Sequence, residues 1–363
     1  MKIGIVVNKA GALVGLTPTI IKKYIADGHS ILIEQGAGEE SYISDEMYRE
    51  AGAKLMSGME VLSSCELLLL SHPLTDEALG LLSNDTVVCG LLDPYNQPQF
   101  VERLKVSNVL PFALEFLPRT SIAQSMDTLS SMASLAGYKA VIAAADKLPG
   151  YFPMLTTAAG TVPPAKVLVL GAGVAGLQAI ATAKRLGAQV EAFDVRKAVK
   201  EEVESLGGRF IEVSGSTDDS DAGGYAVEQS DAYKAKQKEL IHEKAVKADV
   251  IIATANIPGK KAPILIEKAS IEGMRPGSVI VDLAAASGGN CEGTVNNEIV
   301  VNSGVTMIGD SSLAYKLPRE ASKLYSNNLY NFTRHVLKNG VEEIDFQDKI
   351  VSDTYIGKSH NAQ

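Results

Sequence analysis

One stretch of the chain, Lys166 to Arg196, restricts the possible folds more than any other. It begins with a short apolar run, Val167–Leu170, that is typical of a strand buried on both faces of a parallel sheet. Three glycines in a G-x-G-x-x-G pattern follow directly: Gly171, Gly173 and Gly176. A helical pattern then runs to Gly187, and a second strand, Gln189–Phe193, leads into Asp194. Strand, glycine loop, helix, strand and acid in this order match the dinucleotide-binding fingerprint.

Each glycine of the pattern has a separate physical role. Gly171 permits a tight turn, Gly173 lets the backbone approach a pyrophosphate with no Cβ in the way, and Gly176 lets the helix pack closely on the strand. The phosphates would lie against the free N–H groups and the positive dipole end of the helix. The same pattern also occurs in ordinary glycine-rich turns, so the prediction depends on the strands, the helix and the acid that surround it.

The acid at the end of the second strand favours NAD(H) over NADP(H). Asp194 can accept hydrogen bonds from both hydroxyls of an adenosine ribose, whereas a 2′-phosphate at that place would meet a carboxylate. Arg196, two residues further on, is the one feature that favours the phosphorylated dinucleotide. We expect its side chain to stack near the adenine or to face solvent.

Length and composition favour a two-domain globular protein. The 363 residues exceed what one typical core organises, and 46% hydrophobic with 21% charged residues is ordinary globular composition. A net charge of −9 argues against a nucleic-acid partner, which would require clustered Lys and Arg. Cys65, Cys89 and Cys291 are far apart, so we expect reduced, buried side chains and no metal site. We expect no targeting sequence and no membrane-spanning segment.

The N-terminal third of the chain repeats a strand–helix rhythm without a nucleotide fingerprint. Short apolar runs predict strands at residues 3–7, 30–34, 67–70, 86–89 and 109–112. The predicted fold class is therefore α/β, with two doubly wound, Rossmann-like domains that have mostly parallel sheets and are linked by long helices around a cleft. We place the first domain at residues 1–130, joined by a C-terminal helical segment at 313–363, and the nucleotide domain at 131–312.

A polar segment lies where the two predicted domains join. It contains, within a dozen residues, Arg119, Gln124, Asp127, Ser130 and Ser131, and a long helix rich in small residues follows it. So many hydrogen-bonding groups at a domain junction indicate the lining of a ligand cleft. The alternative is a solvated loop that caps the helix.

Several other segments bear on the site or on the fold. Residues 214–224 form a polar, acidic and glycine-rich loop, and loops of this length inside a domain are often functional. Residues 253–257 and 282–290 follow predicted strands and are expected to line the cofactor crevice. Residues 148–165 are predicted to be a proline- and glycine-rich connector, and residues 340–363 a tail with few anchors.

The sequence offers no convincing acid–base catalyst beside a nicotinamide. Of the five histidines only His72 follows a strand directly, and its alternative role is that of a turn residue. Dehydrogenation of a hydroxy or amino acid needs a base and a cation for the substrate carboxylate. Hydride exchange between two nicotinamides releases no substrate proton, so alignment of the two rings is sufficient for it.

Several segments, in the same order, resemble the alanine dehydrogenase/transhydrogenase family, in particular the NAD(H)-binding component (domain I, within the alpha subunit) of proton-translocating transhydrogenases. The similar segments are PRTSIAQSMDTLSSMASLAGYKAV, GAGVAGLQAIATAKRLGAQVEAFDVR, GGYA, IPGKKAP and GSVIVDLAAASGGNCEGT. They lie within residues 110–337. The resemblance implies an enzyme component that binds NAD(H) and exchanges hydride directly with NADP(H) bound by a partner.

The resemblance also implies roles for single residues at the nicotinamide end. Arg119, Asp127 and Ser130 would hold the carboxamide and its surroundings. Gln124 would lie between the two cofactors and reach the ribose of the partner's NADP(H).

At the adenosine end, the resemblance implies that Asp194 binds the ribose. The adenine and pyrophosphate contacts would be completed by residues of the fingerprint, the acidic loop and a later helix: Val174, Val195, Arg196, Gly224 and Gln237. Tyr225 would be the aromatic residue of a loop that closes over bound nucleotide. Asn256, which stands where the family often has leucine, would lie on the adenine side.

Partners and location follow from the same resemblance. The chain would form a homodimer on a membrane-spanning component, with a separate NADP(H)-binding domain facing it. Hydride transfer would be coupled to proton translocation through the membrane component. The chain would lie on the cytoplasmic side of the inner membrane, bound peripherally through its partner subunits.

Two segments depart from the family pattern. The N-terminal stretch NKAGALVGLTP has no arginine where the family usually carries a Gly-Glu-Arg-Arg-Val-Ala type of segment. The lysine and histidine of alanine dehydrogenases are also missing, from LLSHPLTDE and CGLLDPYN, which favours a transhydrogenase component. The alternatives are a soluble amino-acid dehydrogenase of the alanine type and a non-catalytic module that senses NAD.

Overall fold

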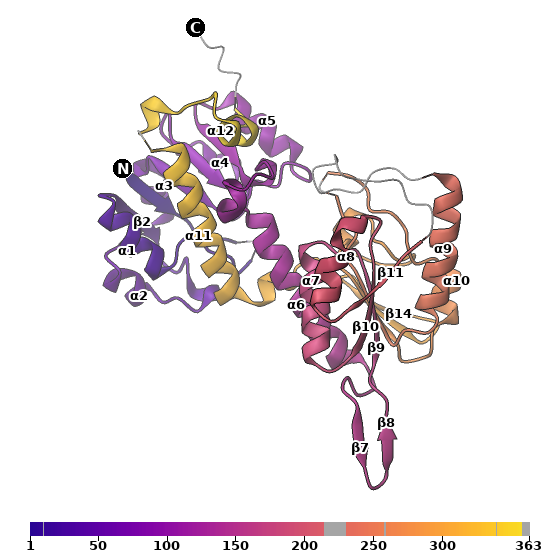
Figure 1. The fold of residues 1–363 in the computed structure, drawn as a ribbon. Helices are drawn as coiled ribbons and strands as arrows, with labels where there is room; N and C mark the ends of the chain where they lie inside the picture. Colours follow the sequence, from indigo (N-terminus) through magenta and orange to yellow (C-terminus); the bar gives the residue numbers. More distant parts are fainter. Residues whose placement is uncertain (10, 214–229, 258, 339, 358–363) are drawn as a thin grey trace. The chain divides into compact units, whose positions relative to one another are not determined.

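The structure is a computed structural model that describes residues 1–9, 11–213, 230–257, 259–338 and 340–357. The chain divides into two compact units (Figure 1). The first comprises Met1–Met132 and the chain from Tyr315 onward, and the second comprises Ala133–Ala314. The boundary falls within helix α6, Thr128–Lys147. Each unit contains one large sheet, and the predicted α/β class with two mostly parallel sheets is confirmed.

The first unit is built on a parallel sheet whose described strands have the order β3-β2-β1-β4-β5-β6. Their bounds are β1 Lys2–Ile5, β2 Ser30–Glu34, β3 Lys54–Met56, β4 Leu67–Leu70, β5 Val87–Gly90 and β6 Leu110–Ala113. Ile3 of β1 lies beside Ile31 on one side and Leu67 on the other. β4 consists of four buried leucines, as expected for a strand that is covered on both faces.

Short helices connect these strands, and a long helix from the far end of the chain joins them. The short helices are α1 Pro18–Ala26, α2 Asp45–Glu50, α3 Gly58–Ser64, α4 Asp76–Leu79 and α5 Pro98–Val106. The long helix is α11, Pro318–Val336. The Tyr24 hydroxyl of α1 lies 2.6 Å from Thr333 Oγ1 of α11, and Thr17 N–H donates to Ser326 Oγ at 3.0 Å. These buried bonds explain why a C-terminal helix belongs to the N-terminal unit.

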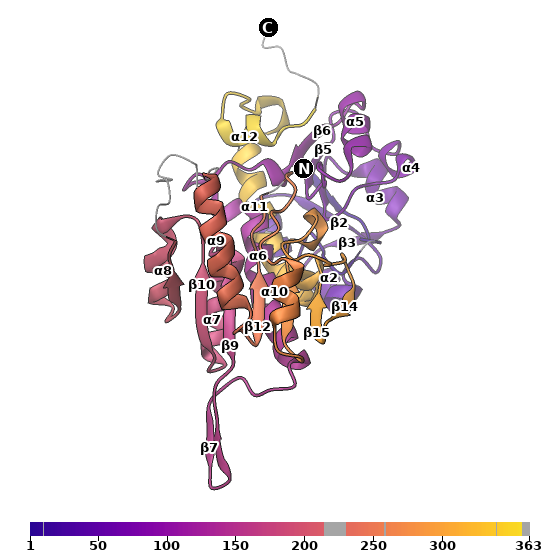
Figure 2. The ribbon, with the colours of Figure 1, turned by 90° about the vertical axis from the view of Figure 1, so that its right-hand side faces the viewer.

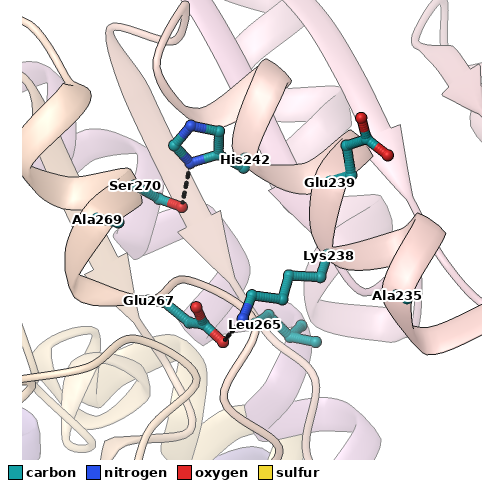
Figure 3. Close-up of a pocket in the computed structure, with 8 residues that line it drawn as sticks. All are labelled: Ala235, Lys238, Glu239, His242, Leu265, Glu267, Ala269 and Ser270. Carbon is teal, nitrogen blue, oxygen red and sulfur yellow. Dashed lines mark hydrogen bonds and ion pairs between the residues drawn. The ribbon is translucent and has the colours of Figure 1, made fainter. Parts of the chain in front are cut away.

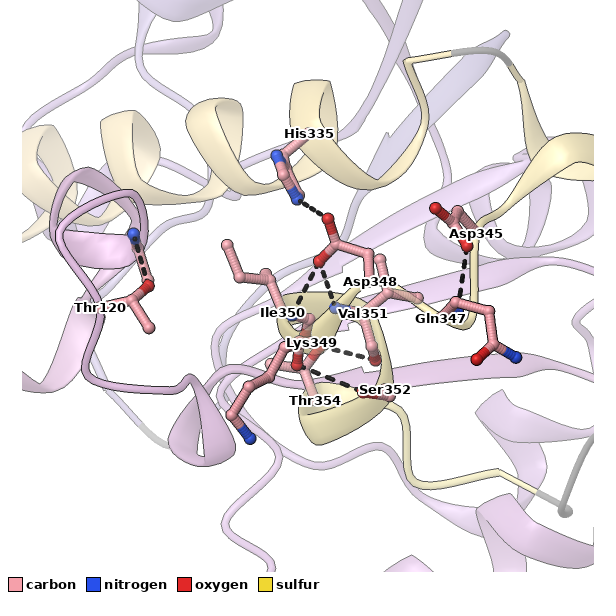
Figure 4. Close-up of polar contacts among 11 residues, drawn as sticks. Thr120, His335, Asp345, Gln347, Asp348, Lys349, Ile350, Val351, Ser352 and Thr354 are labelled. Atoms are coloured by element: carbon pink, nitrogen blue, oxygen red, sulfur yellow. Dashed lines mark hydrogen bonds and ion pairs between the residues drawn. The ribbon is translucent and has the colours of Figure 1, made fainter.

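The residues after α11 are anchored, so the prediction of a loose tail is wrong for residues 340–357 (Figure 4). They include a further helix, α12, Lys349–Thr354. Asp348 caps this helix, and its second oxygen lies 2.9 Å from His335 Nε2 of α11. Tyr355 packs against Phe112 of β6 with 5.4 Å between ring centroids. The contact with β6 could not be predicted from this short polar sequence, because Phe112 lies more than two hundred residues away along the chain.

Glu115, just after β6, makes the stability of the first unit depend on pH. Its Oε1 accepts from Asp93 N–H at 2.7 Å, whereas its buried Oε2 has no hydrogen-bond partner among the described residues. Burial raises the pKa of Glu115 to about 7, from 4.5 for an ordinary glutamate. The unfolded chain therefore releases this proton at lower pH than the folded chain. Protonated Glu115 therefore makes its full contribution to the free energy of unfolding below pH 4.5. About 3 kcal/mol of this contribution is lost as the pH rises to about 7.

We therefore expect Glu115→Gln to remove this pH dependence. At pH 8 the variant should be more stable than the wild type, and near pH 4.5 the two should be similar. Urea unfolding measured between pH 4.5 and 8 tests this. Glu102→Gln, which removes an exposed partner of Lys105, is the control and should leave the pH profile almost unchanged. Parallel profiles for the wild type and Glu115→Gln would contradict the expectation.

The second unit is built on a sheet whose described strands have the order β11-β10-β9-β12-β13-β15-β14. Their bounds are β9 Lys166–Leu170, β10 Gln189–Phe193, β11 Arg209–Ile211, β12 Val250–Ala253, β13 Val279–Asp282, β14 Ile299–Asn302 and β15 Val305–Ile308. All pairs are parallel except β14 with β15. The strand order runs outward from β9 in two directions: β10 and β11 lie on one side of β9, and β12 and β13 lie on the other.

Helices cover both faces of this sheet. On one face α6, α7 (Val174–Arg185) and α8 (Lys200–Ser205) share a core with the sheet. On the other face lie α9 (Asp231–Ala245) and α10 (Lys268–Gly273), which stand before β9, β12 and β15 in Figure 2. A Cβ at Gly137 of α6 would lie 2.1 Å from the carbonyl oxygen of Ala175 in α7. Glycine is therefore required for the close packing of these two helices.

The predicted connector before β9 contains a hairpin that the sequence did not reveal. Its strands are β7, Leu155–Thr157, and β8, Gly160–Val162, and it projects from the second unit (Figure 1). All six strand residues are exposed. In the described part of the chain, no helix has both the length and the hydrophobicity to cross a bilayer.

Candidate dinucleotide site

Four adjacent strands of the second unit end at the same edge of the sheet. Leu170 of β9 pairs with Phe193 of β10 on one side and with Ala253 of β12 on the other, and Ala253 pairs with Asp282 of β13. The glycine loop, Asp194 and the loops after β12 and β13 therefore begin side by side. The strand order reverses between β9 and β12, although the strands themselves are parallel. This edge is therefore the switch point at which doubly wound sheets bind ligands.

The protein itself requires the first and the third glycine of the fingerprint. Gly171 has a positive φ of 93°, and a Cβ there would lie 2.7 Å from Thr254 Oγ1. A Cβ at Gly176 would lie 1.8 Å from the carbonyl oxygen of Gly171, where no side chain fits. The turn and the contact between α7 and β9 explain both glycines without any ligand.

No contact with the described part of the protein requires a glycine at position 173. It has an ordinary extended conformation, φ −78° and ψ −167°, and an added Cβ would meet no described atom within 4 Å. It precedes α7 as the N-cap residue, where Ser, Asp or Asn would normally satisfy a free N–H group. A bare backbone in open space before a helix N-terminus is the arrangement that close approach of a phosphate requires.

Asp194 is fixed by backbone donors of the fingerprint. Its side chain is 6% exposed, and its oxygens accept from Ala172 N–H at 2.7 Å and from Arg196 N–H at 2.9 Å. The first bond ties the acid to the glycine loop. The carboxylate therefore has one orientation at the edge of the sheet.

The side chain of Arg196 pairs with Asp194, so the expectation that it faces solvent is wrong. Its Nε lies 3.0 Å from Oδ1 and its Nη2 lies 2.9 Å from Oδ2 of the acid. The arginine side chain is only 19% exposed. A buried carboxylate two residues away offers a guanidinium two charge-assisted hydrogen bonds, which explains this orientation.

The loop after β12 is held by a side chain of the loop after β13. Asn290 is fully buried; its Oδ1 accepts from Ala255 N–H at 3.0 Å, and its Nδ2 donates to Ala255 O at 2.8 Å and to Pro263 O at 2.9 Å. Asn256, the predicted adenine-side residue, comes next and is exposed. Its backbone is therefore positioned by the neighbouring loop.

Asp282, the last residue of β13, organises that second loop. Its buried carboxylate accepts four hydrogen bonds, from the N–H groups of Ala284, Asn290 and Cys291 and from the Thr294 hydroxyl. We expected residues 282–290 to line the crevice. We did not expect that two of them, Asp282 and Asn290, would fix the loops after β12 and β13 by hydrogen bonds. The available signal was a buried strand that ends in an acid shortly before Gly-Gly-Asn.

The polar segment of the first unit brings Asp127 and Ser130 together. The two oxygens of Asp127 accept from the Ser130 N–H at 2.8 Å and from its hydroxyl at 2.6 Å, at the start of α6. Asp127 thus makes the helix-capping contact that the alternative interpretation predicts. Arg119 and Gln124 precede it in the same segment, and both are exposed.

Side chains of helix α11 form hydrogen bonds with the polar segment that contains Gln124 and Asp127. Asn328 donates to the Ser125 carbonyl at 3.0 Å and accepts from the Ser131 hydroxyl at 2.8 Å. Asn331 donates to the same carbonyl at 3.1 Å. Hydrogen bonds from α11 therefore fix the backbone next to Gln124.

The remaining predicted residues occupy different places. Val174, the first residue of α7, is exposed, whereas Val195 and Gln237 are partly buried, the latter on α9. Gly224 and Tyr225 lie outside the described residues.

A shallow pocket of about 250 Å³ lies beside α9 (Figure 3). Lys238 Nζ is 2.8 Å from Glu267 Oε1, and His242 Nδ1 is 3.0 Å from Ser270 Oγ. No described residue of the predicted site lines this pocket. It is therefore separate from the strand-end site.

The groups that the sequence singled out for acid–base or metal chemistry are His72 and the three cysteines. Burial, and then nearby Lys9, lower the pKa of His72, so its ring is neutral at pH 7. The three cysteines are free and buried, as predicted. No group of three or more His, Cys, Asp or Glu side chains in the described ranges is arranged to hold a metal ion.

Comparison with known proteins agrees with this geometry. Residues 8–136 match the family described as alanine dehydrogenase/PNT, N-terminal domain, and residues 140–362 match its C-terminal domain. The first part of NAD(P) transhydrogenase subunit alpha from Rhodospirillum rubrum is 44% identical over 354 residues, which cover 94% of this chain and 92% of that protein. The crystal structure of transhydrogenase from Sinorhizobium meliloti superposes with a TM-score of 0.89 at 37% identity, covering 99% of both chains. An L-alanine dehydrogenase is more distant, with a TM-score of 0.81 at 25% identity, covering 98% of this chain and 94% of that chain.

Proposed function

The chain belongs to the alanine dehydrogenase/PNT family, and within this family we propose that it is the NAD(H)-binding subunit of a proton-translocating transhydrogenase. It binds NAD(H) and exchanges hydride directly with NADP(H) that a partner domain holds. The observation that carries this proposal is Gly173, whose missing side chain leaves room that no described part of the protein uses.

The adenosine half of NAD(H) fits the strand-end site of the second unit. The pyrophosphate takes the space before α7, against Gly173 and Val174, where the free N–H groups of the helix favour negative charge. Asp194 binds the adenosine ribose from its fixed position. The remaining contacts on this side are assigned to Val195, Gly224, Tyr225, Gln237 and Asn256.

The nicotinamide half is assigned to the polar segment of the first unit. Arg119, Asp127 and Ser130 hold the carboxamide, and the pairing of Asp127 with Ser130 supports this because it keeps both side chains in one orientation. Gln124 is exposed and therefore available to a second nucleotide.

The bound nicotinamide supplies the hydride, and the residues of the chain supply alignment. No proton has to leave either substrate when hydride passes from one nicotinamide ring to another, so the reaction needs no general base. The proposed reaction therefore does not depend on His72 or on the described cysteines.

We expect Gln124→Asn to slow hydride transfer about 10-fold or more, because a side chain shortened by one methylene misaligns the two rings. NADH affinity should stay within about threefold, since the glutamine is exposed and does not hold the adenosine half. Stopped-flow transfer with the NADP(H)-binding partner, beside NADH titration, measures both. A large loss of NADH binding without a change in transfer rate would count against the assignment.

The assembly that we propose is a homodimer on membrane-spanning partner subunits, on the cytoplasmic side of the inner membrane. The exposed hairpin β7–β8 supports a dimer, because Met154, Leu155 and Val162 are 65%, 41% and 42% exposed and an isolated two-stranded hairpin is marginally stable in water. Light scattering of the purified chain should give twice the monomer mass. A monomer at micromolar concentration would contradict the dimer.

Titration with nucleotides and substrates tests the function as a whole. The proposal requires tight NADH binding, weak NADPH binding and no turnover of amino or hydroxy acids by the chain alone. Transhydrogenation should appear only when the NADP(H)-binding partner is added. Oxidation of alanine with NAD by the chain alone would identify an amino-acid dehydrogenase instead, and NADH binding without any transhydrogenation would indicate a sensor.

A further inference from the structure

We infer that Arg196 competes with the adenosine ribose for Asp194 and thereby sets the affinity of the chain for NAD(H). The inference rests on the proposed NAD(H) function and adds a residue that opposes binding. In the structure the arginine side chain donates to both carboxylate oxygens of Asp194, the group to which the ribose diol is assigned.

The carboxylate of Asp194 has no hydrogen-bonding capacity left in this state. A carboxylate accepts about four hydrogen bonds, two at each oxygen. Oδ1 accepts from Arg196 N–H at 2.9 Å and from Nε at 3.0 Å. Oδ2 accepts from Ala172 N–H at 2.7 Å and from Arg196 Nη2 at 2.9 Å. A ribose with two hydroxyl donors must therefore displace existing donors.

The two backbone donors cannot be the ones that leave. The Ala172 N–H belongs to the glycine loop, whose neighbours Gly171 and Gly176 are constrained by close contacts. The Arg196 N–H belongs to the backbone at the N-cap of the short helix Lys197–Val199. The guanidinium is the movable donor, because it ends a flexible side chain that is still 19% exposed.

Binding then exchanges an ion pair for two hydroxyl–carboxylate bonds. The fraction of molecules in which the guanidinium has left Asp194 multiplies the intrinsic affinity, so a stable pair weakens the observed affinity. Replacing the guanidinium by a neutral amide should raise the fraction that is ready to bind. Asp194 keeps its two backbone donors in that variant, so its orientation is retained.

The test compares nucleotide binding by the wild type and by Arg196→Gln in the full-length chain, with calorimetry. We expect Arg196→Gln to tighten NADH binding by about threefold or more. The gain should also appear with AMP and should vanish with 2′,3′-dideoxy-AMP, which has no hydroxyl to take the vacated acceptors. Arg209→Gln removes an exposed arginine of β11 from its partner Glu191 in the middle of β10, and it should change the binding of neither nucleotide.

Unchanged or weaker NADH binding in a folded Arg196→Gln variant would overturn the inference, and so would an equal gain with the dideoxy nucleotide. If the amide variant does not fold, Arg196→Lys replaces the two-pronged contact by a single donor, and a smaller gain in the same direction is expected from it. No tightening in Arg196→Lys would then overturn the inference. Failure of the wild type to bind NADH at all would instead refute the proposed function.

Discussion

Gly173→Ala should fold like the wild type and lose most of its affinity for NADH. The added Cβ meets no described atom within 4 Å, and the backbone of Gly173 is one that alanine adopts without strain. The same Cβ would stand where the pyrophosphate comes closest to the backbone. Crowding of a well-fitted contact costs about 1–3 kcal/mol, so NADH should bind about 10- to 100-fold more weakly.

Gly176→Ala is the matched control because the same methyl group has the opposite consequence there. Its Cβ would lie 1.8 Å from the Gly171 carbonyl oxygen, so this variant should be destabilised by several kcal/mol or fail to fold. Calorimetric unfolding and NADH titration of both variants separate the two effects. A Gly173→Ala variant that binds NADH as tightly as the wild type would show that no ligand approaches this glycine.

Asp282→Ala should cause a large loss of stability without any steric clash. It leaves four donors around one carboxylate without their acceptor: the buried N–H groups of Ala284, Asn290 and Cys291 and the partly buried Thr294 hydroxyl. Each unsatisfied group costs about 1–3 kcal/mol, reduced by relaxation, so we expect a loss of about 3–5 kcal/mol. Because Asn290 holds the loop after β12, NADH binding should weaken together with stability.

The control for this variant is Asp249→Ala in the same sheet. Asp249 also accepts a backbone hydrogen bond, from Lys166 N–H at 2.9 Å, but its side chain is 22% exposed and water can replace it. Its removal should cost about 1 kcal/mol. Thermal unfolding of the two variants compares them directly. Equal losses would contradict the organising role of Asp282.

Much of the fold could be predicted because its strands carry a local signature. Four consecutive buried leucines in β4 and the run Val167–Leu170 in β9 are apolar enough to indicate parallel strands covered on both faces. The fingerprint placed Gly171, Gly173, Gly176 and Asp194 in their correct relation because turn, helix and acid follow one another within a short stretch. Local chemistry of this kind does not depend on distant residues.

The features that could not be predicted depend on distant partners. Asn290 bonds with Ala255, thirty-five residues away, and nothing in the sequence near either residue indicates the pair. The segment 340–357 is ordered by α11 and β6, and its own polar sequence resembles a tail. The pairing of Arg196 with Asp194 was not predicted, because the sequence shows that an arginine follows the acid but not that the acid is buried within its reach.

The most direct measurement of the central claim follows the hydride itself. NADH that carries deuterium at the transferred position is bound to this chain and mixed with the partner domain loaded with NADP⁺. If one nicotinamide ring passes hydride to the other, the deuterium appears in NADPH and none is found in water. Deuterium released to solvent, or NADP⁺ left unreduced while the chain alone turns over alanine, would contradict it.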